Sequence, residues 1–130
     1  VMRSAIEDAG IQPEQIGYVD AHGTATDVGD VEETNAVYSL FKRAVPISSQ
    51  KSYTGHTLGA CGVLEAFFAI NMMKEKWFAP NLNLTEVDDR LPDLHYITGD
   101  GLHLDTEYVM SNNFAFGGVN TSLIFKRYVP

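Results

Sequence analysis

The chain has 130 residues, of which 45% are hydrophobic and 20% are charged, values typical of one globular domain with its own core. Nine basic against seventeen acidic residues give a net charge of −8 at pH 7, which argues against nonspecific binding to nucleic acid or to an anionic membrane. A single cysteine cannot form an internal disulfide, and the first residues have no charged-then-apolar leader pattern. We therefore expect a protein of the reducing cytoplasm.

The first part of the chain alternates predicted helices and strands. Residues 2–9 have apolar side chains at helical spacing and stop at Gly10, a common helix cap. The segment IGYVDAHG, residues 16–23, has the composition of a short strand with a glycine at its exit. A second helix is predicted from Asp27 to Phe41, since acidic residues fill its first turns and basic residues follow its end. The segment AVPISS, residues 44–49, is predicted to be the next strand.

The second part contains one long apolar run followed by strands. The run from Leu58 to Met73 is interrupted by Glu65 and Asn71 and is shorter than the ~20 residues of a membrane span, which indicates a buried helix. Residues 93–98 and 102–105 flank a Gly-Asp-Gly turn and predict a hairpin. Residues 107–113 and 121–128 are predicted to be two more strands, antiparallel neighbours joined by FAFGGVN. The interleaved elements favour an α/β fold.

The four histidines fall into two groups. His22 follows a predicted strand and His56 precedes a predicted helix, positions where a rigid α/β scaffold commonly presents functional groups. His95 and His103 instead alternate with leucines in the predicted hairpin, which indicates the exposed face of a ribbon. Two candidates for chemistry therefore remain, His22 and His56.

Other kinds of site fit the sequence less well. Zinc would need a further ligand beside His22 and His56, and no HxxxH or HExxH pattern is present, so no metal is expected. Cys61 and His56 could form a nucleophile pair, but Cys61 lies between Ala60 and Gly62, where a buried packing role is more typical. The segment GHTLGACG also lacks the spacing of a phosphate-binding loop.

A lysine and a glutamate flank the second histidine. Glu65 lies inside the most apolar predicted helix, where an unpaired carboxylate is costly, and Lys51 is its plausible partner. Neutral histidines that donate hydrogen bonds would suit a thioester oxygen that gains negative charge. The residues alone indicate half of an α/β active site with histidine donors, or two histidines that only anchor their loops.

Four segments carry a family resemblance. VDAHGTATDVGDVEE, ISSQKSYTGHTLGACGVLEA, APNLNL and MSNNFAFGGVNTSLIF resemble, in order, the C-terminal part of a β-ketoacyl-[acyl-carrier-protein] synthase. The resemblance extends over essentially all of residues 1–130, and its two-histidine, decarboxylating branch fits because His56 occupies the second histidine position. It implies a thiolase-like layered fold, of which this chain would be the C-terminal half, a mixed sheet packed with helices.

The resemblance also implies a reaction and its partners. In this family a cysteine of the N-terminal half takes the acyl chain from acyl carrier protein. Malonyl-carrier then loses carbon dioxide, and the resulting carbanion attacks the acyl-cysteine. The resemblance implies no cofactor beyond the phosphopantetheine of the carrier, and a homodimer when the enzyme is complete. A non-catalytic subunit of the chain-length-factor type is the alternative, whereas a thiolase would keep a second cysteine near the C-terminal glycine pair.

Site residues follow by position from the same resemblance. His22 and His56 would bind the malonyl thioester oxygen, and Lys51 and Glu65 would be the ion pair that organises the site. Further matches are the pantetheine-contacting threonines Thr24 and Thr26, and the acyl-pocket gating residues Phe114, Phe116, Gly117 and Gly118. Cys61 stands where the family commonly has alanine. Gln50, Ala115 and Val119 are departures from the family pattern, and Ala115 is expected to stiffen the gating loop.

Overall fold

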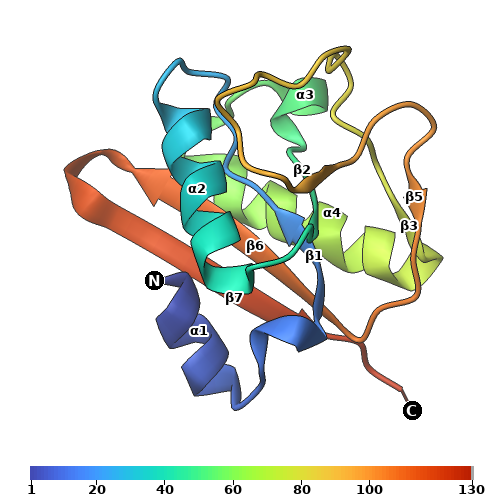
Figure 1. Ribbon diagram of the computed structural model, residues 1–130. Coiled ribbons are helices and arrows are strands. Elements are labelled where there is room, and N and C mark those ends of the chain that lie inside the picture. The colour runs from blue at the N-terminus through green and yellow to red at the C-terminus, as the bar shows by residue number, and fades with distance from the viewer. Residues whose placement is uncertain (130) are drawn as a thin grey trace.

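The computed structural model describes residues 1–129, and its centre is a five-stranded mixed sheet in the order β4-β2-β1-β6-β7 (Figure 1). The strands are β1 (Ile16–Asp20), β2 (Pro46–Ser48), β4 (His95–Tyr96), β6 (Tyr108–Ala115) and β7 (Val119–Lys126). Strand β1 pairs in parallel with β2 and β6, β2 pairs in parallel with β4, and β7 is antiparallel to β6. The carboxyl ends of β1, β2 and β6 therefore share one edge of the sheet.

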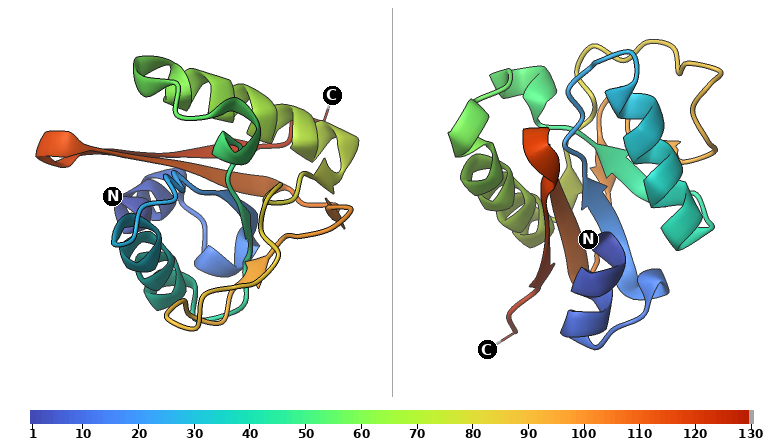
Figure 2. Two further views of the ribbon diagram at one scale, coloured as in Figure 1. Left: turned by 90° about the horizontal axis from the view of Figure 1, so that it is seen from above. Right: turned by 90° about the vertical axis from the view of Figure 1, so that its left-hand side faces the viewer.

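Helices cover both faces of this sheet. Helices α1 (Met2–Ala9) and α2 (Gly29–Phe41) lie on one face, and α4 (Cys61–Glu75) lies on the other (Figure 2). Consecutive strand residues point to opposite faces, so Val19 joins the core under α1 and α2 while Tyr18 joins the core under α4. The layered mixed α/β fold expected from the sequence is confirmed.

Shorter elements connect these layers. Helix α3 (Lys51–Thr54) follows β2, and 3₁₀ turns span Pro13–Gln15, Leu58–Ala60 and Phe116–Gly118. Strands β3 (Trp77–Phe78) and β5 (Leu102–His103) form a separate two-stranded antiparallel sheet. Within residues 1–129, no helix is long and apolar enough to cross a membrane.

Several predicted elements are confirmed with small shifts. Helix α1 ends at Gly10, whose φ of 65° is left-handed and whose N–H closes the helix. Helix α2 begins at Gly29, two residues later than Asp27, and ends at Phe41 as predicted. The last two strands are antiparallel neighbours, but β6 ends two residues later and β7 begins two residues earlier than predicted, so the turn between them is only the 3₁₀ turn of residues 116–118.

The predicted hairpin of residues 93–105 is wrong. Strand β4 pairs in parallel with β2, and β5 pairs with β3. Gly99 and Gly101 do form a turn with positive φ, but Leu94 and Ile97 anchor its first arm in the two opposite cores. The alternation of apolar and polar residues along a strand does not specify which strand it pairs with. Here the burial of Leu94 and Ile97 in the two cores determined the pairing. The side chains of His95 and His103 are exposed, as expected.

The predicted buried helix after His56 is buried on one side only. Helix α4 buries Glu65 and Ala69 against the sheet, but Val63 is 75% exposed and Phe67 is 60% exposed on its other side. Apolar residues lie on both sides of α4, which is why the sequence indicated burial. Residues 1–129 cover only the side that faces the sheet. An exposed apolar face of this kind commonly marks an interaction surface.

Candidate active site

The candidate site lies at the carboxyl edge of the parallel strands. His22 follows β1, Lys51 and His56 follow β2, and Phe114 lies near the end of β6. Since these strand ends meet at one edge, side chains more than ninety positions apart in the sequence converge there. The rings of His22 and His56 have centroids 5.3 Å apart and stand edge to face, and the ring of Phe114 lies 6.2 Å from that of His22.

A buried glutamate of α2 holds the loop that carries His22. The carboxylate oxygens of Glu33 accept hydrogen bonds from the backbone N–H groups of His22 and Gly23, each at 2.8 Å. Burial raises the pKa of Glu33 to about 7, although these two backbone donors favour its ionised form. Gly23 has a φ of +46°, and a Cβ there would lie 2.5 Å from Cβ of Ser49, so only glycine fits this turn.

Lys51 is the centre of the polar contacts in the site. Its ammonium group forms an ion pair with Glu65 of α4, and both side chains are about nineteen-twentieths buried. Its Nζ also lies 3.1 Å from Nδ1 of His22. The second oxygen of Glu65 accepts a hydrogen bond of 3.0 Å from Nδ2 of Asn113, at the end of β6. Three strands and α4 are thereby tied together around one buried ion pair.

Burial and the contact with Lys51 together determine the protonation and the tautomer of His22. Burial lowers the pKa of His22 to about 4, and the positive charge of Lys51 and the neighbouring His56 act in the same direction. His22 is therefore neutral at pH 7. Because an ammonium group only donates, Nδ1 of His22 is the acceptor, and the ring proton resides on Nε2.

His56 has the same tautomer for a different reason. The backbone N–H of Leu58 donates to Nδ1 of His56 at 3.1 Å, so a neutral His56 also carries its proton on Nε2. Sγ of Cys61 lies 3.2 Å from the same Nδ1, and Cys61 is 2% exposed. The burial expected of Cys61 is thus confirmed, and its sulfur also contacts the histidine. The two histidines together offer two N–H donors to one oxygen.

An acidic residue that the sequence analysis did not single out lies next to this cluster. Asp20, the last residue of β1, is 1% exposed. Burial, and next the charge of Glu65, raise its pKa well above the usual value. Asp20 is therefore stabilised in its protonated form, which lets the ion pair of Lys51 and Glu65 persist beside it.

The remaining residues expected in the site divide into two groups. Thr24 and Thr26 lie on the loop after His22 with their hydroxyl oxygens 3.1 Å apart, and Phe114 contacts His22. The other three gating residues, Phe116, Gly117 and Gly118, form the turn at the tip of the β6–β7 hairpin, and Phe116 is fully exposed. Ala115 has an extended backbone with a φ of −119°, so alanine takes this position without strain.

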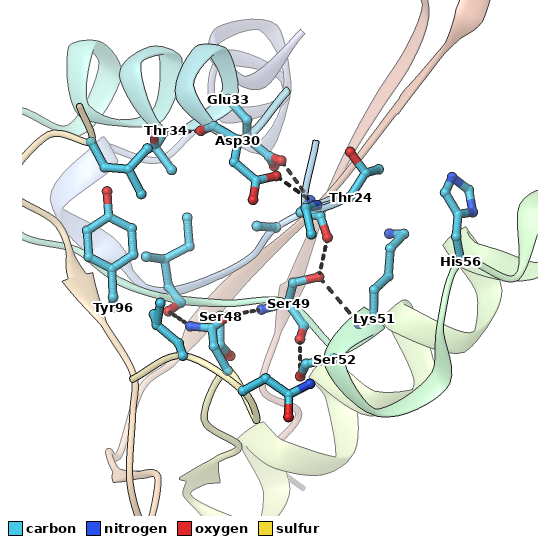
Figure 3. A pocket seen from close by; sticks show the side chains of 18 of the residues that line it. Thr24, Asp30, Glu33, Thr34, Ser48, Ser49, Lys51, Ser52, His56 and Tyr96 are labelled. Carbon is cyan, nitrogen blue, oxygen red and sulfur yellow. Dashed lines mark hydrogen bonds between the residues drawn. The ribbon is translucent and has the colours of Figure 1, made fainter. Parts of the chain in front are cut away.

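A cavity of about 470 Å³ opens beside the cluster (Figure 3). Lys51 and His56 lie at one end of it, and Thr34 and Tyr96 lie at the other. Its polar lining includes Thr24, Asp30, Glu33, Ser48, Ser49, Ser52 and Asn81. Lys51 and His56 therefore border a cavity that is large enough for a small molecule.

Sequence reasoning missed Glu33, Asp20 and Asn113. Glu33 resembles the other acidic residues at the start of the predicted helix, but it lies about one turn inside α2, which begins at Gly29. Asp20 ends an apolar strand, which is a detectable signal of a buried acid. Asn113 had no local signal, because its partner Glu65 is 48 residues away.

Comparisons with known proteins identify the family of the chain. Residues 1–85 match the family model described as "Beta-ketoacyl synthase, C-terminal domain". The chain is 41% identical over 130 residues to the 3-oxoacyl-[acyl-carrier-protein] synthase 2 of Staphylococcus aureus (strain COL), covering 98% of this chain and 31% of that protein.

Solved structures show the same fold. A crystal structure of a β-ketoacyl synthase from Burkholderia phymatum matches with a TM-score of 0.97 and 59% identity, covering 98% of this chain and 31% of that one. A ketosynthase in complex with its chain length factor from Xenorhabdus doucetiae matches with a TM-score of 0.87 and 38% identity, covering 95% and 31%. The fold and site thus define a ketosynthase-type α/β domain.

The chain belongs to the β-ketoacyl synthase family and matches its C-terminal domain. It spans about a third of the length of the relatives that it matches.

Proposed function

We propose that this chain is the C-terminal third of a β-ketoacyl-[acyl-carrier-protein] synthase that extends an acyl chain by decarboxylative Claisen condensation. The observation that carries the proposal is the shared tautomer of His22 and His56, in which Nδ1 accepts and Nε2 donates. Two Nε2–H donors at one edge of the sheet match the need to stabilise a thioester oxygen as it becomes negative. The names of the relatives point to the same chemistry.

In this mechanism an upstream cysteine first accepts the acyl group from acyl carrier protein and releases the carrier thiol. The carbonyl oxygen of malonyl-carrier then accepts hydrogen bonds from Nε2–H of His22 and His56. The bond between the malonyl methylene carbon and its carboxylate breaks, carbon dioxide leaves, and the electron pair forms an enolate on the thioester. The enolate carbon attacks the acyl-cysteine, and the cysteine thiolate leaves. Burial and Lys51 keep His22 neutral, and Lys51 orients its ring throughout.

Binding of the carrier arm falls to the loops around the two histidines. In this proposal Thr24 and Thr26 contact the pantetheine, and the segment from Phe114 to Gly118 gates the acyl pocket. Their support is the position of Thr24 and Phe114 beside His22 and the exposure of the hairpin tip. Acyl and malonyl thioesters on acyl carrier protein are the substrates, no further cofactor is needed, and the complete enzyme is a cytoplasmic homodimer.

The remaining two thirds of the protein would supply the cysteine and cover the exposed side of α4. Three apolar side chains are exposed on this side: Val63 (75%) and Phe67 (60%) on α4, and Leu123 (46%) on β7. Clustered exposed apolar residues of this kind commonly mark a surface that another domain or protein covers. The matched relatives have about twice as many further residues as this chain contains, which is enough for a second domain of similar fold. The isolated chain is therefore expected to be inactive and prone to self-association.

A non-catalytic subunit of the chain-length-factor type is the second candidate, favoured only by the complex in which one of the matched ketosynthases occurs. The two accounts differ in the upstream residue at the nucleophile position, which is cysteine in the enzyme. His22, His56 and Lys51 together support the enzyme, because a subunit without chemistry has no need for this donor set.

The direct test is condensation by the full-length protein. Purified full-length protein is incubated with an acyl-carrier and malonyl-carrier, and the 3-oxoacyl product is measured by mass spectrometry. The same assay is run on residues 1–130 alone and on the full-length His56→Ala variant. The proposal predicts product only with the unaltered full-length protein, and product from residues 1–130 alone would contradict it.

A further inference from the structure

The thiol of Cys61 contacts Nδ1 of His56, and the proposed mechanism gives this contact no role. Its Sγ lies 3.2 Å from Nδ1 of His56, although a cysteine chosen only for packing needs no such contact. Oγ1 of Thr57 donates to the same sulfur at 3.4 Å. Cys61 is 2% exposed, so its sulfur approaches the ring of the exposed His56 from the buried side.

The direction of the sulfur contact follows from its neighbours. The backbone N–H of Leu58 is a fixed donor to Nδ1 of His56, so this nitrogen holds a lone pair and no proton. Nδ1 has one lone pair, so in this arrangement an S–H of Cys61 shares that lone pair with the N–H of Leu58. Thr57 donates to the sulfur, Cys61 donates to the imidazole, and the result is a short relay of hydrogen bonds that ends at His56.

Leu58, whose N–H donates to His56, has a strained backbone. Its φ of 53° is left-handed, a conformation that is strained for a leucine. Strained residues of this kind concentrate where a site must be held in one geometry. With the backbone as its single donor, the ring of His56 could still rotate about that contact, whereas a second donor from α4 fixes the ring to the helix.

We propose that Cys61 is a positioning residue, whose thiol, oriented by Thr57, holds His56 in the Nε2–H tautomer and in the orientation that decarboxylation requires. The inference rests on the proposed function for its catalytic consequence, but the contact itself does not. An S–H is a weak donor, so the effect is a modest tuning. The sulfur forms no bond with substrate at any step.

The contact is tested on full-length protein labelled with [¹⁵N]histidine. Ring ¹⁵N resonances are recorded for the wild type, Cys61→Ala, Cys61→Ser and Thr57→Val, and the loss of signals in His56→Asn assigns His56. In Cys61→Ala, the Nδ1 resonance should move toward that of a free, unprotonated ring nitrogen. Cys61→Ser keeps a donor and should move it back toward the wild-type position, while Thr57→Val should give a smaller shift in the alanine direction.

Kinetics supply the second readout. Decarboxylation of malonyl-carrier by Cys61→Ala should show kcat reduced by about two- to fivefold with KM unchanged, and Cys61→Ser should return to within about twofold of the wild type. Identical Nδ1 resonances in the wild type and Cys61→Ala would overturn the proposal, as would an equal loss of activity in the alanine and serine variants. If the resonances shift as expected but no variant or wild type releases carbon dioxide, the contact stands and the proposed function fails.

Discussion

Nζ of Lys51 lies 3.1 Å from Nδ1 of His22 while the same ammonium group forms a buried ion pair with Glu65. One side chain therefore satisfies a carboxylate and sets the protonation of an imidazole. Since Lys51 and Glu65 come from α3 and α4, the state of His22 depends on how these helices pack.

Replacing the lysine should change the titration of the histidine. Burial, Lys51 and His56 lower the pKa of His22 to about 4, and Lys51→Met removes one of these causes while leaving the charge of Glu65 nearby. The pKa of His22 should then rise toward 6.5. Proton NMR of the His22 ring against pH in the full-length protein measures it, and titration that stays near pH 4 would show that Lys51 has no such role.

Loss of the anchor on α2 should loosen the histidine loop. In Glu33→Gln one amide oxygen replaces two carboxylate oxygens, so one of the N–H groups of His22 and Gly23 loses its acceptor. We expect a loss of about 1–3 kcal/mol in the free energy of unfolding and at least tenfold faster exchange of these two amides. Hydrogen exchange by mass spectrometry measures the second effect. Unchanged exchange in this segment would remove Glu33 from the site.

The buried acid at the end of β1 predicts a pH effect of defined sign. Burial raises the pKa of Asp20, so the unfolded chain loses this proton first, near pH 4, and the stability that Asp20 contributes is lost as the pH rises toward the folded pKa. Asp20→Asn is neutral at every pH and should remove this loss. Urea unfolding at pH 8 should find the variant more stable than the wild type by about 1–3 kcal/mol, with a smaller difference at pH 5. A variant that becomes relatively less stable from pH 5 to pH 8 would contradict the assignment.

Two alanines offer a matched test of backbone strain. Ala25 has a left-handed φ of 55°, whereas Ala115 is extended with a φ of −119°. Glycine at position 25 relieves a strain of about 1–2 kcal/mol that exceeds its entropic cost, so Ala25→Gly should stabilise by about 0.5–1 kcal/mol. Ala115→Gly has no strain to relieve and should destabilise by about 0.5 kcal/mol. Thermal unfolding of both variants decides it, and equal shifts in Tm would refute the argument.

The sequence was sufficient for the elements whose signals are local. The cap at Gly10, the acidic start of α2 and the β-branched strand before His22 each placed an element within a few residues. Pairing of β4 was not predictable, because His95 and Tyr96 find their partner in β2 nearly fifty residues earlier. Exposure of Phe67 was missed for a related reason, since an apolar pattern does not state which part of a protein covers it.

In the candidate site, too, the features with a local sequence signal were predictable and those that depend on distant contacts were not. His22 and His56 stand out by their positions after a predicted strand and before a predicted helix, and Lys51 and Glu65 by the cost of burying an unpaired carboxylate. The structure brings all four together. The tautomers were not predictable, because they depend on Lys51 and on the backbone N–H of Leu58. Neither contact has a sequence signature.

The central claim is that His22 and His56 act together as donors during decarboxylation. The decisive measurement is carbon dioxide release from malonyl-carrier by the full-length protein, His22→Ala, His56→Ala and the double variant, with acylation of the upstream cysteine followed in parallel. The account predicts that each single variant loses at least a hundredfold in carbon dioxide release, that the double variant is little worse, and that acylation remains measurable in all of them. Carbon dioxide release at the full rate by either single variant would contradict it.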